Sequence, residues 1–302
     1  MPLYEHGVGF GVIGKVLGHD IIQYWTGRED DLREFMKHFT AFYRLMGYDT
    51  VNWDHNIGTY MPDSGALLGI REGVIKDRAD FERYPWDEVG ERFFADTGKY
   101  FKALREVMPA GMKAMGGAGN GIYECVVDVV GYENLCYLSV DDPELFADLF
   151  HKVGDVNYGI WKRLLEENAD LYAVCRFGDD LGFKSQTLIA PEDIKRYIVP
   201  EYKRIIELIH SYGKPFIYHS CGKIFDVMDE IIDVARIDAK HSNEDAIAPF
   251  MEWVKRYGDR IGNFGGMDVD VICRDSESSI KARTKELIGQ VTARKEGRGF
   301  AL

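Results

Sequence analysis

The sequence lacks the features that would place the chain in a membrane or outside the cell. No uninterrupted apolar segment in its 302 residues approaches the ~20 residues that a membrane-spanning helix needs. The first six residues, MPLYEH, have neither the basic start nor the apolar core of a signal peptide. We therefore predict a cytoplasmic protein that has no membrane as a partner.

Cysteine is scarce, and its distribution excludes a disulfide scaffold. The chain has five cysteines, an odd number, scattered from residue 125 to residue 273. Disulfide-stapled domains are typically short, secreted and rich in paired cysteines. A reducing compartment is therefore the simpler expectation, in agreement with the missing signal peptide.

Basic residues are outnumbered, which restricts the classes of partner and substrate. The 37 lysines and arginines face 50 aspartates and glutamates, so the net charge is −13 and the isoelectric point about 5.1. An acidic surface does not attract nucleic acid or anionic membranes, and we predict neither as a partner. A highly anionic substrate is also disfavoured unless a local basic pocket exists.

The rest of the composition is that of a globular protein, with 46% hydrophobic and 29% charged residues. Apolar residues recur at helical spacing in several segments, and short β-prone runs lie between them. Helices are predicted over residues 30–46, 95–107, 143–167, 191–212, 224–234, 250–257 and 276–291, and strands over residues 50–53, 111–115, 171–177, 215–219, 237–240, 260–264 and from residue 299.

This alternation of strands and helices predicts a parallel sheet with crossover helices. Seven strands are counted, and an eighth is placed in residues 8–13. A TIM-type (β/α)8 barrel, formed as one domain by residues 1–302, fits better than an open sheet, because no early Gly-x-Gly-x-x-Gly opens a dinucleotide fold. We expect residues 1–27 to be irregular, a hairpin to be inserted at about residues 60–80, and the last strand to be cut at residue 302.

Polar and ionisable side chains follow most of the predicted strands. In a parallel barrel the carboxyl ends of the strands meet at one face, where the active site lies. The residues at these ends are Asp54, His55, Asn56, Asn120, Asp179, Asp180, His219, Cys221, His241 and Asp268. This pattern favours an enzyme, with Asp54, His55, Asn120, Asp179 and Asp268 as candidates for substrate binding.

His219 and Cys221 are the strongest candidates for chemistry. They lie two residues apart at a strand end, so their side chains point the same way. Imidazole and thiolate are both good zinc ligands. His241, at the end of the next strand, is the nearest candidate for a third ligand. The alternatives are that Cys221 is a small buried hydrophobe and that His241 pairs with a nearby carboxylate.

Asp179 and Asp180 are neighbours, so at most one of them faces the mouth of the barrel. Asp180 is the candidate for orienting a substrate or acting as general base, and it is a catalytic candidate together with His219. Asp54 and His55 either bind substrate or cap the loop that follows them. Cys273 lies well beyond its strand end, and we expect it in the core.

Several short motifs resemble the uroporphyrinogen decarboxylase superfamily. They are Gly131-Tyr132-Glu133-Asn134-Leu135, Gly178-Asp179-Asp180-Leu181-Gly182, Tyr218-His219-Ser220-Cys221-Gly222, Tyr257-Gly258-Asp259-Arg260-Ile261 and Gly265-Gly266-Met267-Asp268. The resemblance runs from about residue 18 to the end. It implies a TIM-type barrel, in agreement with the strand count.

The superfamily that the chain resembles has at least two chemistries. True decarboxylases of the superfamily use no metal and grip a carboxylate-rich porphyrinogen with an arginine-rich N-terminal motif, whereas the first arginine here is Arg28. In the corrinoid-dependent methyltransferases, the His-x-Cys pair binds zinc, and a later cysteine completes the site. His219 and Cys221 match that pair, and this chain stops before such a cysteine.

We therefore predict a methyltransferase that moves a methyl group between a small molecule and a corrinoid carried by a partner protein. Zinc is predicted to be held by His219 and Cys221, with His241 as the candidate for the third ligand. No corrinoid-binding module is visible in the chain. The runner-up is a uroporphyrinogen-type decarboxylase, and a third reading is a non-catalytic binding barrel. Since barrels of this superfamily often pair, a homodimer is an expectation.

Overall fold

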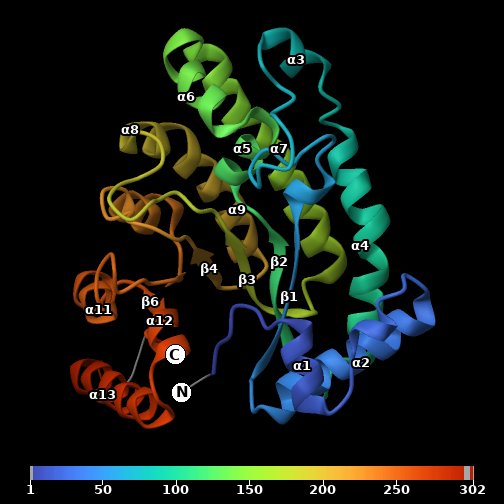
Figure 1. Cartoon of the computed structure of the whole chain (residues 1–302). Helices are drawn as coiled ribbons and strands as arrows, with labels where there is room; N and C mark the ends of the chain where they lie inside the picture. The colour runs from blue at the N-terminus through green and yellow to red at the C-terminus, as the bar shows by residue number, and fades with distance from the viewer. Residues whose placement is uncertain (1–2, 296–299, 302) are drawn as a thin grey trace.

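A computed structural model describes residues 3–295 and 300–301, and its strands lie in the middle of the molecule with helices around them (Figure 1). Within these residues seven parallel strands form one sheet in the order of the sequence. The strands are β1 (Thr50–Asn56), β2 (Lys113–Gly119), β3 (Tyr172–Gly178), β4 (Phe216–His219), β5 (Ala239–His241), β6 (Gly262–Phe264) and β7 (Phe300–Ala301). The predicted TIM-type barrel architecture is confirmed.

Helices connect the successive strands, as a parallel sheet requires. The α-helices are α1 (Phe10–Leu17), α2 (Glu29–Leu45), α3 (Arg78–Arg83), α4 (Glu88–Val107), α5 (Ile122–Val130), α6 (Tyr132–Asp141), α7 (Pro143–Asn168), α8 (Pro191–Asp193), α9 (Val199–Ser211), α10 (Met228–Glu230), α11 (Phe250–Tyr257), α12 (Val269–Arg274) and α13 (Glu277–Lys295). Shorter 3-10 turns are η1 (Ile22–Tyr24) and η2 (Ile57–Tyr60), and π-helical turns are η3 (Ile194–Ile198) and η4 (Ile231–Ala235). No helix in the described ranges is long and apolar enough to cross a membrane.

The register of the strands places the candidate functional residues at the same height along the strands of the sheet. Gly178 on β3 pairs with His219 on β4, and His219 pairs with His241 on β5. The residues that directly follow Gly178 and His219 therefore lie close together at the carboxyl end of the sheet.

The interior of the barrel is filled partly by the N-terminal segment. A small apolar cluster contains Met115 of β2, Ile217 of β4, Ala239 of β5 and Ala301 of β7, and Tyr4 packs among them. The main core lies on the other side of the sheet, between the strands and the helices. The segment before α1 thus enters the barrel, a position that no periodic pattern indicates.

Two predictions about the N-terminal region were wrong. Residues 10–17 form a helix, so residues 1–27 are not irregular throughout, and the eighth strand placed in residues 8–13 is absent from the described chain. Phe10, Ile13, Gly14 and Leu17 follow helical spacing, and Ile13 and Gly14 are buried. Gly7, Gly9 and Gly11 had favoured an irregular segment, so the helical spacing of the apolar residues was not recognised in the sequence.

The hairpin predicted at about residues 60–80 is also wrong, since this fully described segment consists of turns before α3. Its backbone is held by helix α5 instead of by a second strand. Gly65 N donates to Asp128 Oδ1 at 2.9 Å, and Val74 N and Ile75 N donate to Val129 O at 2.8 and 3.0 Å. The carbonyl of Val129 lies at the end of α5, where no further turn of the helix can use it.

Other boundaries agree with the sequence. Asp142 caps α7 by accepting a hydrogen bond from Leu145 N at 2.9 Å, and Pro143 occupies the first turn. Pro200 lies in the first turn of α9, directly after the π-helical turn η3. This position is expected, because proline has no backbone N–H to donate and is tolerated only at the start of a helix. The last predicted strand is present as β7, and Leu302 lies outside the described residues.

Candidate metal and substrate site

The ends of β3 and β4 bring Asp180, His219 and Cys221 together. Cys221 Sγ lies 3.6 Å from His219 Nε2, and Asp180 Oδ1 lies 3.6 Å from the same nitrogen. Asp180 is held in place because its Oδ1 accepts a hydrogen bond from Cys221 N at 2.8 Å. The three side chains offer ligand atoms that all lie within 4.8 Å of one another.

This spacing suits a tetrahedral zinc ion. Bonds of about 2.0–2.1 Å to nitrogen or oxygen and about 2.3 Å to sulfur place neighbouring ligands about 3.4–3.6 Å apart. The two distances of 3.6 Å to His219 Nε2 are close to that requirement, and the third pair of ligand atoms lies within 4.8 Å. Asp180, His219 and Cys221 therefore form a candidate ligand set for zinc, and Asp180 is a candidate ligand to which the sequence had assigned another role.

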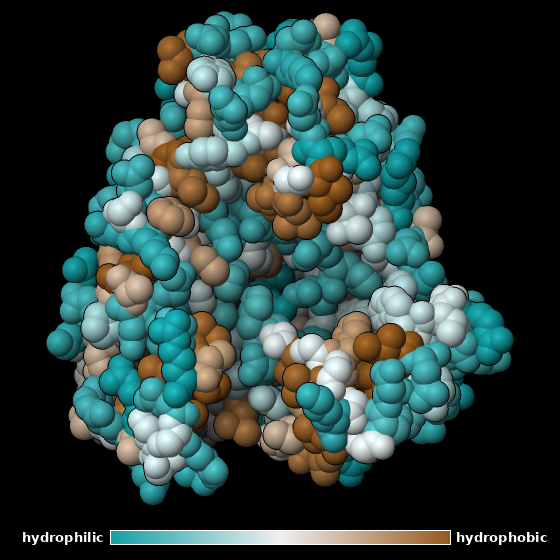
Figure 2. Space-filling model, viewed as in Figure 1, coloured by the Kyte–Doolittle hydropathy of each residue, from teal (hydrophilic) through white to brown (hydrophobic). Residues whose placement is uncertain are grey.

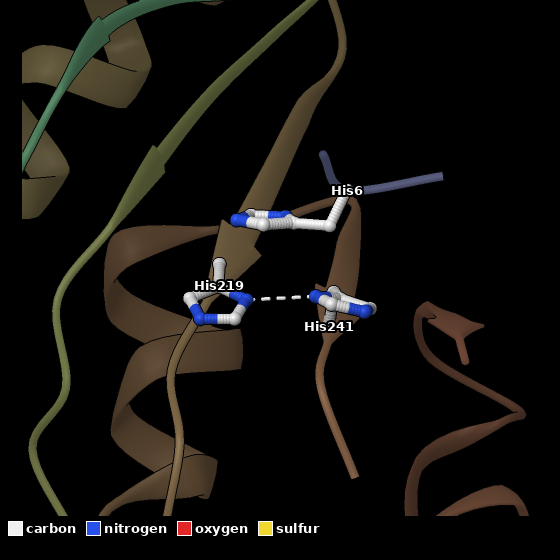
Figure 3. A group of neighbouring side chains, drawn as sticks. All are labelled: His6, His219 and His241. Carbon is white, nitrogen blue, oxygen red and sulfur yellow. Dashed lines mark hydrogen bonds between the residues drawn. The ribbon is translucent and has the colours of Figure 1, made fainter. Parts of the chain in front are cut away.

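His241 lies on the opposite edge of the His219 ring. The two Nδ1 atoms are 2.7 Å apart, a hydrogen-bond distance that is shorter than the spacing of two ligands on one zinc ion (Figure 3). Cys221 approaches the other ring nitrogen, Nε2. The predicted ligands His219, Cys221 and His241 thus do not surround one point, because the two nitrogens of an imidazole point in different directions.

The sequence missed His6, which joins the site from the N-terminal segment. Its ring stacks on those of His219 and His241, with centroid distances of 4.2 and 4.9 Å (Figure 3). His6, His219 and His241 form a second group whose ligand atoms lie within 4.8 Å of one another. His6 follows no predicted strand, so the strand-end pattern that found the other residues could not find it.

Two buried side chains position His6. Tyr4 OH lies 2.9 Å from His6 Nδ1, and Arg176 Nη1 donates to Tyr4 OH at 3.2 Å and to His6 O at 3.3 Å. The guanidinium of Arg176 also forms an ion pair with Asp54. This network fixes the N-terminal segment against the ends of the strands.

Burial sets the protonation of the site. It lowers the pKa of His219 to about 4 and that of His241 further still, so both imidazoles are neutral near pH 7. Burial, and then the nearby charge of Asp180, raises the pKa of the Cys221 thiol to about 11. Neutral imidazole is the form that binds a metal, and a bound metal would displace the thiol proton.

Asp179 has a structural position, which corrects its predicted contact with substrate. Its side chain is fully buried and accepts hydrogen bonds from Tyr123 N at 2.9 Å and Glu124 N at 2.8 Å, in the first turn of α5. Tyr202 OH donates to the same carboxylate. Asp179 and Asp180 thus diverge as predicted, but only Asp180 lies beside His219.

Asn120 and Asp268, also predicted to bind substrate, are engaged in local structure. Asn120 adopts a left-handed φ of 59° and donates from Nδ2 to Glu124 Oε2 at 2.8 Å. Asp268 accepts hydrogen bonds from Asp270 N, where it caps α12, and from Asp245 N, both at 2.8 Å. Cys273, expected in the core, is exposed on α12.

Asp54 and His55 line a cavity of about 340 Å3 between β1 and the N-terminal helices. The molecule is hollowed near the middle of the face shown in Figure 2. The lining residues are His6, Gly7, Val8, Phe10, Trp25, Phe39, Tyr43, Asn52, Trp53, Asp54, His55, Tyr60, Asp96, Tyr100 and Arg176. Because His6 belongs both to this lining and to the histidine group, the cavity adjoins the candidate metal site.

The fold and the site together define a class of protein. Parallel strands in sequence order, surrounded by helices and ending in clustered His, Cys and Asp side chains, make a TIM-type barrel with its polar site at the strand ends. The family model of uroporphyrinogen decarboxylase (URO-D) matches residues 41–302, and the chain belongs to this family. Members of the superfamily are enzymes.

Two relatives agree with this family assignment, and a solved structure agrees with the fold. The chain is 25% identical over 272 residues to a uroporphyrinogen decarboxylase of Streptomyces coelicolor, of which the match covers 72%, and 26% identical over 174 residues to that of Streptomyces avermitilis, of which it covers 44%. The matches take in 86% and 57% of this chain. A methyltransferase from Methanosarcina mazei has the same fold, with a TM-score of 0.69 and 15% identity over 99% of this chain and 86% of the other.

Proposed function

We propose that the protein is a zinc-assisted methyltransferase that moves a methyl group between a small molecule and a corrinoid carried by a partner protein. The observation that carries this proposal is the set Asp180, His219 and Cys221, whose spacing suits zinc, beside a cavity of substrate size. The fold of the Methanosarcina mazei methyltransferase supports the same branch of the superfamily.

Each residue of the set has a role in this proposal. Asp180 Oδ1, His219 Nε2 and Cys221 Sγ would hold zinc, which when bound supplies Lewis acidity to an oxygen or sulfur of the substrate. His241 Nδ1 lies 2.7 Å from His219 Nδ1, and in this proposal it would accept the proton of that nitrogen and so keep Nε2 of the His219 ring free to bind. Asp54 and His55 face the substrate from the wall of the cavity.

The second candidate is a decarboxylase, which the names of the Streptomyces relatives favour. The lining of the cavity argues against it. Arg176 is the only lysine or arginine among the lining residues, and its guanidinium is already paired with Asp54. A porphyrinogen with many carboxylates would need several cations that are free to pair.

The proposal predicts that the zinc-loaded protein changes the methylation state of free cobalamin, used in place of a protein-bound corrinoid. Methylcobalamin with a thiol or phenol acceptor, and reduced cobalamin with methyl ethers or methyl thioethers, would be followed by the absorbance of the cobalt–methyl bond. We expect turnover with zinc and at least ~100-fold less after Cys221→Ser, since a zinc ligand is lost.

Cys136→Ser is the matched control, because this exposed cysteine lies on α6, away from the strand ends. Uroporphyrinogen would be supplied in parallel, with loss of carboxyl groups measured by mass spectrometry. Loss of carboxyl groups in a metal-free sample, with no change in cobalamin, would replace this proposal by the decarboxylase.

A further inference from the structure

We infer that the cavity beside β1 binds an uncharged, flat ring compound that carries a hydrogen-bond-accepting oxygen. The inference rests on the proposed function, since it names the class of small molecule that the same site would take. Four properties of the cavity carry it: its paired charges, its aromatic walls, its unpartnered donors and its position beside His219.

The charges of the lining residues are already neutralised. Asp54 is paired with Arg176, and Asp96 is paired with Lys99 at 3.1 Å and accepts a hydrogen bond from Tyr60 OH at 3.0 Å. Burial lowers the pKa of His55 to about 4, so its ring is neutral near pH 7. A charged ligand would lose its hydration without gaining an unpaired counter-ion, which makes the cavity selective for uncharged molecules.

Aromatic rings form much of the wall. Trp25 and Tyr100 are stacked with centroids 5.2 Å apart, and Trp53 lies 6.0 Å from Tyr100. Tyr60 and Phe39 belong to the same lining. Rings that meet at these distances offer flat surfaces, and a flat ligand gains both burial and offset stacking from them.

Two donors in the wall have no hydrogen-bond partner within the described chain. They are Asn52 Nδ2 and Trp53 Nε1, and each residue is only 7% exposed. His55 Nε2, which donates or accepts according to its tautomer, is also unpartnered. A buried donor left unpaired costs about 1–3 kcal/mol. An oxygen atom on the ligand that accepts from such a donor would recover part of this free energy.

The position of the cavity links the ring compound to the chemistry. His6 lines the cavity, and its ring stacks on His219 at a centroid distance of 4.2 Å. A substituent of a bound ring that extends past His6 would therefore point toward His219. A methyl group on the ligand oxygen would be such a substituent.

Four monosubstituted benzenes test the inference: anisole, toluene, benzoate and benzyltrimethylammonium. Their binding to the full chain would be measured by calorimetry and by quenching of tryptophan fluorescence, without metal or cobalamin. We expect anisole to bind at least ~10-fold more tightly than either charged probe, and several-fold more tightly than toluene. Equal or tighter binding of benzoate or benzyltrimethylammonium would overturn the inference.

Two variants locate the binding. Asn52→Leu, which keeps the volume and removes one of the two donors, is expected to lower the preference for anisole over toluene while toluene still binds. Gln186→Ala is the control, because this exposed residue lines a separate cavity near α6 and α8. If Asn52→Leu leaves the preference unchanged while thermal melting shows a folded protein, the assignment of the acceptor site is wrong.

The two proposals fail in different ways. Tight binding of anisole with no change in the methylation of cobalamin would overturn the methyltransferase and leave this inference intact. Methyl transfer by a protein that binds a charged probe more tightly than anisole would support the methyltransferase and overturn this inference.

Discussion

Replacing Cys221 with serine is expected to weaken zinc binding by at least ~100-fold. The loss of a residue that only orients a ligand costs about 10–100-fold in metal affinity, and Cys221 is expected to touch the metal itself. Its Sγ lies 3.6 Å from His219 Nε2, at the spacing of two zinc ligands. Competition with a chromogenic chelator measures the affinity of purified protein directly.

Cobalt(II) gives a second readout that does not depend on activity. A cobalt–thiolate bond produces a charge-transfer absorption that a set of nitrogen and oxygen ligands lacks, so the band should be present in the wild type and absent after Cys221→Ser. Cys273→Ser, on exposed α12, is the control and should keep the band.

His241→Ala separates the two ligand groups that share His219. If His241 only accepts the Nδ1 proton of His219, the variant should bind zinc about 10-fold more weakly and keep the cobalt–thiolate band. If His241→Ala abolishes binding and Cys221→Ser does not, the metal is held by His6, His219 and His241 instead.

Replacing Asp179 with alanine is expected to lower the free energy of unfolding by about 3–6 kcal/mol. The carboxylate accepts hydrogen bonds from Tyr123 N, Glu124 N and Tyr202 OH, and each donor left buried and unpaired costs about 1–3 kcal/mol. A domain has only about 5–15 kcal/mol of stability in total. Urea denaturation followed by circular dichroism measures the change.

Asp180→Ala is the matched control, because it removes the same group one residue farther along. The Asp180 side chain is 40% exposed, and its donor Cys221 N is part-buried at the strand ends instead of inside the core, so the stability should change by less than about 1 kcal/mol. Zinc affinity should show the opposite order, with a large loss for Asp180→Ala. A destabilisation below about 1 kcal/mol for Asp179→Ala would contradict this account of α5.

The residues at the strand ends could be predicted from the sequence. Side chains alternate in direction along a strand, and the carboxyl ends of parallel strands meet at one face of a barrel. His219 and Cys221 occur two residues apart after a buried strand, so their common direction follows from the sequence alone. The neighbourhood of β3 and β4 also follows, since consecutive strands of a parallel barrel are adjacent. The sequence therefore placed both Asp180 and His219 at the mouth of the barrel, and in the structure Asp180 Oδ1 lies 3.6 Å from His219 Nε2.

The roles of individual side chains were less predictable. Asp179 and Asp180 are identical in type and adjacent in sequence, yet one caps α5 from a fully buried position and the other faces the histidine. His241 was expected to share a metal with Cys221 and instead meets the other nitrogen of His219. Such differences depend on the rotation of single side chains, for which the sequence has no periodic signal.

The amino-acid sequence by itself determined the alternation of strands and helices, the acidic charge and the position of His219 and Cys221 at a strand end, because these depend on residues close together in the chain. Only the tertiary structure decided which partners surround that pair. Tyr4 and His6 come from a segment more than 200 residues away, and Arg176 holds them against the barrel through contacts between distant parts of the chain. Contacts of this kind form only when the core has packed.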